Sequence, residues 1–349
     1  MRYLGMDVHA KSTVWCLVDA HGEVLREGKV ATSAAALTAL VQELGNGEEV
    51  LAGQEVGTLT YLVHDALTAI GTRILSFNAH QLRMIAASRK KTGRRDAYWI
   101  AKALQSGMYP HPVYIPTGEI RDLRAMLSRR RALHADHKRW RYRARAYLRA
   151  AGCPAGAGIA ALRAALARPS AALNGSCADA IALCRRQEAA LRAELQRMDA
   201  ALRARAAAID AVQRLMTIPG VGLLVATAIY AWVGDISRFP SAKKLAAYAG
   251  VVPTVRQSGG AVHVGGITKQ GAPTLRVALV QASHVLLARC QRAEAAPLQT
   301  IGDRIRGSRG RRKIAVVALA RHLLRIAYYI LRDGTTYDAV RLGPTTDVA

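Results

Sequence analysis

This sequence has few aromatic residues, few acidic residues and few cysteines. Aromatic side chains make up 5% of the 349 residues, and only two of them are phenylalanine. Alanine and arginine are abundant instead, which favours alanine-rich helices with arginine on their exposed faces. Because 51% of the residues are hydrophobic, we expect a folded chain of two or three domains rather than a disordered one.

The cysteines exclude most cysteine-based architectures. They are odd in number and scattered, without a Cys-x-x-Cys pair, at positions 16, 153, 177, 184 and 290. This spacing fits neither a zinc site nor a disulfide framework, and it is typical of the reducing cytoplasm. No apolar run reaches the roughly 18–20 residues that a membrane span needs, and Met1 leads directly into a strand-like segment. We therefore expect a cytoplasmic protein with no signal peptide and no membrane partner.

Acidic residues are outnumbered by basic ones, 24 against 50, and the net charge is +26. The excess is uneven, since residues 1–80 carry a net charge of −4 and the remaining 269 residues carry +30. Such an excess attracts a polyanion and drives its binding through the release of counterions. Nucleic acid is the expected partner.

Strand and helix signals alternate in the first third of the chain. We predict strands at residues 2–8, 13–19, 23–30, 48–54 and 73–78, and helices at 33–43, 59–70, 79–87 and 94–105. A meander of three strands followed by alternating helices and strands predicts an α/β domain with a mixed sheet and helices on its faces.

The rest of the chain is predicted to be mostly helical. A basic helix over residues 121–149 carries eleven Lys and Arg, and a long amphipathic helix is expected over 178–215. Joined by a Gly-, Ala- and Pro-rich bend at 153–176, these two predict an antiparallel coiled-coil hairpin. A Gly/Ser loop is expected at 253–266. The predicted domains are 1–117, 118–213 and 214–349.

Three acidic residues stand at positions typical of a metal-dependent nuclease. Asp7 lies inside an apolar strand, where a carboxylate is costly unless it is paired or bound to metal. Glu55 ends the fourth strand and Asp96 opens a later helix. This is the layout of ribonuclease-H-like nucleases, whose carboxylates bind Mg²⁺. Each acid alone also has a structural explanation: a strand-end turn for Asp7, a helix N-cap for Glu55 and a helix first turn for Asp96.

Basic residues near these acids and in the basic helix are candidates for contacts to phosphate. Those around Asp96 are Lys90, Lys91, Arg94 and Arg95, and those further along are Arg129, Arg130, Arg139, Arg143, Arg256 and Lys269. A solvated basic face is the alternative. Residues 218–222, Ile-Pro-Gly-Val-Gly, resemble a helix–hairpin–helix turn that offers N–H groups to a phosphate, or form a plain turn.

Ser258 lies between Arg256 and two glycines, in a segment accessible to a bulky backbone. A flexible-loop serine is the default interpretation of that pattern alone.

Together, these motifs resemble the transposases of insertion-sequence family 110, the DEDD-type recombinases that include a pilin-gene invertase. The resemblance covers nearly the whole chain. It rests on residues 3–11 (YLGMDVHAK), Glu55 with Gly57, 91–97 (KTGRRDA), 218–222, Phe239 with 245–250 (LAAYAG), 252–253, 257–259, and 266–271 (GITKQG) followed by Leu275-Arg276.

The resemblance implies a RuvC-like N-terminal domain, a coiled-coil connection and a mostly helical C-terminal transposase domain. It implies a DNA recombinase that uses a bridge RNA, encoded beside its gene, to pair with donor and target DNA. Such proteins act as dimers that assemble into a tetramer on nucleic acid. By motif, Asp7, Glu55 and Asp96 are three of four acids that bind Mg²⁺.

Carried over in the same way, Ser258 is the nucleophile that forms a phosphoserine link to DNA, and Thr268 is the second candidate. The chain departs from the family pattern at Gly93, where the third acid belongs, and we expect a weaker metal site for that reason. The alternatives are a RuvC-like Mg²⁺-dependent endonuclease that uses water as its nucleophile, and a nucleic-acid-binding homologue with weakened catalysis.

Overall fold

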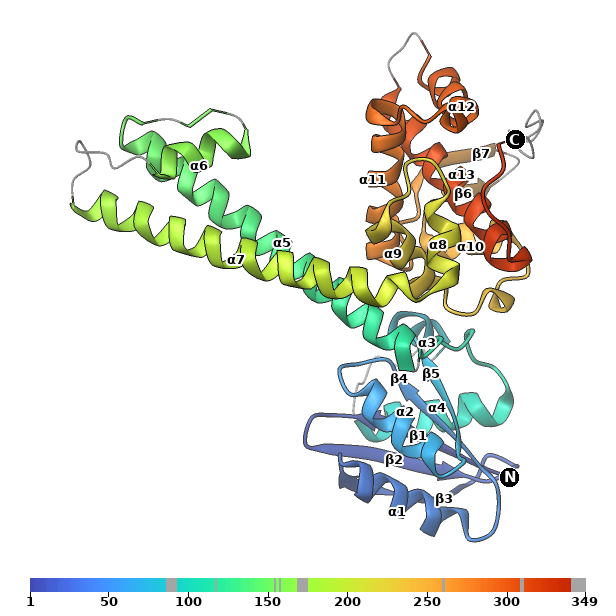
Figure 1. Cartoon of the computed structure of the whole chain (residues 1–349). Helices are drawn as coiled ribbons and strands as arrows, with labels where there is room; N and C mark the ends of the chain where they lie inside the picture. Colours follow the sequence, from blue (N-terminus) through green and yellow to red (C-terminus); the bar gives the residue numbers. More distant parts are fainter. Residues whose placement is uncertain are drawn as a thin grey trace. The chain divides into compact units, whose positions relative to one another are not determined.

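A computed structural model describes residues 1–85, 93–116, 118–153, 155–156, 158–167, 175–258, 261–307 and 311–339. The chain divides into two compact units, Met1–Pro116 and Thr117–Ala349. Figure 1 colours the first from blue to turquoise and the second from green to red.

The first unit is built on a five-stranded mixed sheet. Its strands are β1 (Arg2–Val8), β2 (Ser12–Val18), β3 (Val24–Ala31), β4 (Val50–Glu55) and β5 (Arg73–Phe77), in the order β3-β2-β1-β4-β5. The first three strands form an antiparallel meander, whereas β4 pairs parallel with β1 and with β5. The predicted mixed α/β fold is therefore confirmed.

Helices cover both faces of this sheet. α1 (Ala34–Gly45) and α2 (Thr60–Ala69) pack on one face, where Leu4 and Met6 of β1 join their apolar side chains in one core cluster. α4 (Gly93–Ser106) packs on the other face, and α3 (Ala79–Ile85) follows β5. Since neighbouring residues of a strand point to opposite faces, the alternate set of β1, which includes Gly5 and Asp7, faces α4.

Gly5 allows α4 to lie directly on β1. A Cβ at this buried position would stand 2.0 Å from the carbonyl oxygen of Ala97 and 2.5 Å from the backbone nitrogen of Ala101. A Cβ on Gly93, at the start of α4, would instead stand 2.7 Å from Asp7 Oδ2. The helix therefore runs antiparallel to β1 and begins beside Asp7.

The second unit starts with a helical hairpin. α5 (Gly118–Ala150) and α7 (Gly175–Ala207) lie side by side (Figure 1). The expectation of a bend over 153–176 was wrong in part, because α6 (Ile159–Ala167) forms there. Its Leu162 and Leu166 are one helical turn apart and are buried against α5 and α7, and most of its other residues are alanine, which favours a helix.

The long helix expected over 178–215 is interrupted, because α7 ends at Ala207 and α8 (Asp210–Met216) starts after Ile209. Ile209 has an extended backbone and a buried side chain. Helical elements follow at α9 (Leu223–Val233), η1 (Ile236–Arg238), α10 (Ala242–Ala249), α11 (Pro273–Arg289), η2 (Ala293–Ala295), α12 (Ala296–Arg306) and α13 (Arg312–Asp333).

A β-hairpin stands where a Gly/Ser loop was expected. β6 (Pro253–Ser258) and β7 (Ala261–Ile267) form a two-stranded antiparallel sheet. Every residue of β6 is exposed, so the hairpin lacks the buried face that would have given its sequence an apolar alternation.

The length and hydrophobicity of α13 bear on the expected absence of a membrane span. Among the described residues it is long and apolar enough to do so by length and composition. Most of its residues are buried in this unit, where Leu319, Leu323 and Ala327 join the main core cluster. This burial is typical of the core helix of a folded domain.

The buried His322 of α13 predicts an acid-sensitive second unit. Burial, then Arg325, Arg321 and Arg304, lower its pKa from 6.5 to about 4. His322 therefore takes up a proton near pH 6.5 in the unfolded chain but only near pH 4 in the folded chain. The free energy of unfolding falls as pH drops through this window. The loss amounts to about 3 kcal/mol once pH reaches 4.

Urea unfolding at several pH values measures this loss. We expect His322→Gln to flatten the pH dependence between pH 6.5 and 4, and the exposed His284→Gln to leave it unchanged. An unaltered slope in His322→Gln would contradict the prediction.

Candidate active site and nucleic-acid-binding surfaces

The three predicted acids are held at one end of the sheet by three elements. Asp7 is the penultimate residue of β1 and Glu55 the last of β4, and each follows a residue of the register pair Met6–Gln54. Gly53 faces α4, since a Cβ there would stand 2.9 Å from Ile100 Cγ2, and Glu55 shares that face. Asp96 lies in the first turn of α4. All three acids therefore belong to the α4 side of the sheet.

The pKa of Asp7 is raised, as is common for acids at functional sites. Its side chain is 19% exposed, and its Oδ2 lies 3.0 Å from Nε2 of His9. Burial, opposed by His9 and reinforced by the like charge of Asp96, raises the pKa of Asp7 above its usual value. A carboxylate destabilised by burial and by a second carboxylate is a good ligand for a cation, which relieves both costs.

Glu55 is positioned by a buried amide beside it. Gln54 is fully buried, and its Nε2 donates to the Ser76 hydroxyl on β5 and to the Thr60 carbonyl at the start of α2. These bonds fix the end of β4, so the place of Glu55 is set by the fold.

The fit of a metal ion can be judged from the donors and from the space between them. In the described part of the chain, no three His, Cys, Asp or Glu side chains already form a cluster that could hold a metal ion. The carboxylates are nevertheless hard oxygen donors that face one side of the sheet, and Gly93 leaves a cradle against Asp7 that a Cβ would fill. The chemistry of these donors is the kind that a divalent cation prefers, whereas their present arrangement does not yet form a metal-binding cluster.

The two nucleophile candidates differ in access. Ser258 is exposed at the last position of β6, paired with Ala261 at the tip of the hairpin. Thr268 follows β7, and its Oγ1 is buried with no hydrogen-bond partner among the described residues. Ser258 is therefore the hydroxyl that a phosphate can reach.

The cations expected near Asp96 are only partly described. Lys90 and Lys91 lie outside the described residues. Arg94 is exposed and forms an ion pair with Glu27 of β3, and Arg95 is exposed on the first turn of α4.

Several expected cations further along the chain have intramolecular partners. On α5, Arg129 pairs with Glu194, Arg130 with Asp199 and Arg139 with Asp136, while Arg143 stacks 4.8 Å from the Trp140 ring centre. Arg256 and Lys269 are exposed, in β6 and after β7. Ion pairs within the protein reduce the number of cations that are ready to meet a phosphate.

A groove of about 360 Å³ between α5, α9 and α11 collects the most suitable cations. Arg131, His134 and Lys138 line one wall, and Leu224 and Val277 are among the apolar residues opposite. Burial first, and then neighbouring cations such as Arg130 and Lys138, lower the pKa of His134. The cationic wall suits the phosphate backbone of a nucleic acid.

The predicted turn at 218–222 joins α8 to α9. Gly220 has a φ of +79°, and Gly222 caps α9 without a side-chain hydrogen bond. The first residues of α9 line a second, smaller cavity together with Asp199 and Arg203. The turn therefore offers N–H groups beside one cation and one acid, and phosphate binding there stays a prediction.

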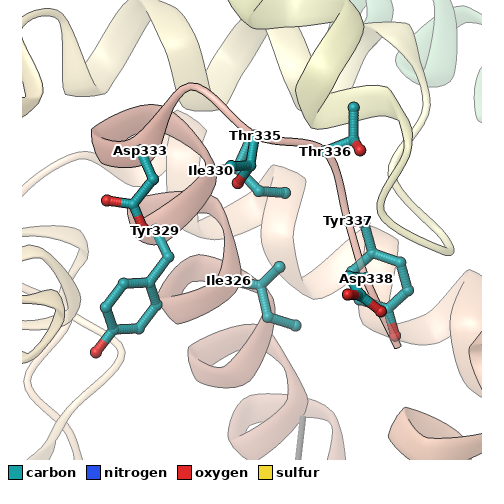
Figure 2. A pocket seen from close by; sticks show the side chains of 8 residues that line it. All are labelled: Ile326, Tyr329, Ile330, Asp333, Thr335, Thr336, Tyr337 and Asp338. Atoms are coloured by element: carbon teal, nitrogen blue, oxygen red, sulfur yellow. The ribbon is translucent and has the colours of Figure 1, made fainter. Parts of the chain in front are cut away.

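A pocket at the end of α13 is unsuited to phosphate. Figure 2 shows Ile326 and Ile330 on one side and the segment after α13 folded back across them, with Asp333 and Asp338 among the lining residues. That segment is held by Tyr337, whose N–H donates to Thr217 and whose hydroxyl donates to the Glu294 carbonyl. These hydrogen bonds attach the segment after α13 to the rest of the second unit.

Sequence reasoning missed two features of these sites. The role of His9 was not predicted, although a histidine two residues after a strand acid is a possible partner of that acid. Arg131, His134 and Lys138 follow the spacing of one helix face, but no sequence pattern shows that α9 and α11 close a groove against them.

Comparison with known proteins gives two family matches. Residues 4–152 match a DEDD-type IS110 transposase model, and residues 212–299 match the model described as Transposase IS116/IS110/IS902 family. The two regions together cover about two thirds of the chain.

Named relatives match shorter regions. The chain is 34% identical over 36% of its length to an uncharacterized 43.6 kDa protein of insertion element IS110 from Streptomyces coelicolor. It is 31% identical over 36% to the transposase of element IS1328 from Yersinia enterocolitica, and 32% over 36% to the pilin gene-inverting protein of Moraxella lacunata. The aligned regions span 30%, 37% and 38% of those relatives. From both domain matches, the chain belongs to the IS116/IS110/IS902 family of transposases.

Proposed function

We propose that this protein is the transposase of a bacterial insertion sequence, which cuts and rejoins DNA in the cytoplasm. The observation that carries the proposal is the placement of Asp7, Glu55 and Asp96 on one side of the sheet, with Asp7 destabilised as an anion. The family match and the net charge of +26 support DNA as the substrate.

The acids have a defined task in this proposal. Asp7, Glu55 and Asp96 hold a divalent cation, which we propose to be Mg²⁺, and this ion polarises the scissile phosphate when bound. The protein supplies the orientation: β1 and β4 fix two carboxylates, and the close packing of α4 on Gly5 fixes the third. We also propose that the first unit is RuvC-like and that the α5–α7 hairpin is a coiled coil.

Ser258 acts as the nucleophile. Its Oγ attacks the scissile phosphorus and loses its proton, a phosphoserine ester forms, and the bond to the leaving DNA oxygen breaks as that oxygen takes up a proton and becomes a hydroxyl. Attack by a DNA hydroxyl in the reverse direction rejoins the strands and frees the serine. The exposure of Ser258 at the hairpin tip supports this role. Arg256 and Lys269, exposed near it in sequence, bind phosphate in the proposal.

We expect a covalent protein–DNA adduct on a suicide substrate that traps the reaction after cleavage. Ser258→Ala should abolish the adduct, because no hydroxyl remains to form the ester, whereas Ser237→Ala, in η1, should retain it. Gel electrophoresis under denaturing conditions and mass spectrometry of the adduct peptide measure both. An adduct that survives Ser258→Ala overturns the serine assignment. Cleavage without any adduct favours a RuvC-like endonuclease that uses water.

A structured guide RNA is the proposed source of target and donor choice, with a dimer or tetramer assembled on the nucleic acids. The cations of the groove, Arg131 and Lys138 among them, support contact with a nucleic-acid backbone. We expect a single discrete RNA to copurify with the expressed protein and to map beside its gene, as RNA sequencing would show. Copurification of unselected cellular RNA would contradict guiding.

A further inference from the structure

We propose that His263 is the general base that removes the proton of the Ser258 hydroxyl, and the general acid that returns this proton when the strands are rejoined. The inference rests on the proposed function, in which Ser258 attacks DNA, and it adds the residue that handles the proton. A serine hydroxyl is a weak nucleophile unless a base beside it takes its proton.

The pairing of β6 with β7 places His263 on the same face of the hairpin as Ser258. Ser258 pairs directly with Ala261. Two residues further along β7, His263 pairs with Arg256. Because side chains alternate between the faces of a strand, Arg256, Ser258 and His263 share one face. Diagonal neighbours in a two-stranded sheet are about 7–8 Å apart, which is within reach of an aromatic ring.

Contacts at the other end of the hairpin agree with this division into faces. A Cβ on Gly265 would collide with Thr254 Oγ1, and that hydroxyl donates to the Gly266 carbonyl. Gly265 is two residues from His263 on β7, so the Thr254 hydroxyl lies on the face that carries His263. Thr254 is likewise two residues before Arg256 on β6, which puts Arg256 on that face too.

The side chains on this face are available to a substrate. Arg256, Ser258 and His263 are all exposed. Within the described part of the chain, neither Arg256 nor His263 has an ion pair or a side-chain hydrogen bond. The hairpin therefore presents a hydroxyl, an imidazole and a guanidinium together, and a guanidinium is suited to hold the oxygens of a phosphate.

No carboxylate lies close to Ser258 in the sequence. Asp and Glu are absent between Asp235 and Glu294, a stretch that contains β6, β7 and α11. Arginine and lysine side chains only donate hydrogen bonds, because they are protonated. Imidazole changes its charge between about pH 5 and 8 and can both accept and release a proton. The stretch contains two histidines, His263 and His284, and only His263 is in the hairpin.

Each proton and bond is accounted for in both directions. In cleavage, the Ser258 Oγ–H bond breaks, its proton moves to His263, and an Oγ–P bond forms. The P–O bond to the leaving strand breaks, and that oxygen takes a proton from water. In rejoining, a DNA hydroxyl attacks phosphorus and loses its proton to water, while His263 returns its proton to Oγ as the phosphoserine bond breaks. His263 thus acts at one oxygen in both steps.

The alternative is an exposed histidine that contacts the DNA backbone without moving a proton. Both interpretations predict that loss of His263 lowers activity. They differ in whether a free base in solution can replace the side chain, because a small base restores proton transfer but restores no contact between protein and DNA.

The test is the rate at which the full chain forms the covalent adduct on the suicide substrate at saturating DNA. His263→Ala should slow this rate about 100-fold or more, with little change in the DNA concentration that gives half the maximal rate. Added imidazole should then raise the rate of this variant about 10-fold or more, and more basic imidazole derivatives should raise it further. His284→Ala is the matched control, because His284 is an exposed histidine of α11 in the same unit. It should react like the unmodified chain, with or without imidazole.

Two results would overturn the role of His263 and leave the proposed function standing. One is a His263→Ala variant that forms the adduct at the unmodified rate. The other is a slow variant that imidazole does not restore, which assigns His263 to DNA contact or to the shape of the hairpin. An adduct that survives Ser258→Ala is a different failure, since it removes the nucleophile of the proposed function itself.

Discussion

Asp7→Asn should reduce recombination by more than about 100-fold while leaving the metal-free protein as stable at pH 7 as the unmodified chain, or more stable. Loss of a charged ligand removes the cation that polarises the phosphate. The stability result follows from the raised pKa of Asp7, caused by burial and then by Asp96, with His9 opposing. A carboxyl whose folded pKa is raised costs stability once pH exceeds the unfolded value of 3.8, because the folded state resists ionisation.

Asp19→Asn is the matched control. Asp19 lies between β2 and β3, and backbone N–H groups, first that of Glu23, lower its pKa. The pKa shift of Asp19 is opposite in sign to that of Asp7. The ionised Asp19 therefore stabilises the fold above pH 3.8, and this stability is lost as pH falls through the lower pKa of the folded state. Asp19→Asn should lower the melting temperature at pH 7 and retain recombination.

Recombination of a plasmid that carries the element ends, together with thermal unfolding in a chelator, measures both variants. Retained recombination in Asp7→Asn would remove the metal-binding role of this acid. It would favour a protein that binds nucleic acid without metal chemistry.

Gly5→Ala should destabilise the first unit by about 3 kcal/mol or more, at the upper end of the range for overpacked cores. The added Cβ would stand 2.0 Å from a carbonyl oxygen of α4, so backbone rather than a flexible side chain has to move. Because α4 carries Asp96, the displacement should also reduce recombination at temperatures where the variant remains folded.

Gly45→Ala is the control for this substitution. Gly45 ends α1, and a Cβ there would meet only Val50 at an ordinary 3.6 Å. This change should be neutral or stabilising by up to about 1 kcal/mol, since alanine favours the helix. Urea unfolding of both variants measures the difference. A cost for Gly5→Ala below that of an ordinary surface change would contradict the close packing of α4 on β1.

Local pattern was a good guide to the strands of the first unit. The strands around Leu4 and Met6 are short apolar runs packed by α1 and α2 on one face and by α4 on the other, and their positions were predicted to within a few residues. The pattern failed where burial came from distant segments. α6 was missed because its leucines are buried by α5 and α7, and the β6–β7 hairpin was missed because β6 has no buried face.

The sequence by itself determined the basic character of this protein, its mixed α/β and helical parts, its three acids and its departure at Gly93. These properties depend on residue type and on local period, which a single chain displays. Only the tertiary structure decided that Asp7 and Asp96 repel one another, that Ser258 is exposed while the Thr268 hydroxyl is buried, and that His9 stands beside the space left at Gly93. The pairs Asp7–Asp96 and His9–Gly93 join residues far apart in the chain through the packing of α4 on β1, and the exposure of a hydroxyl depends on what packs around it, which no local pattern encodes.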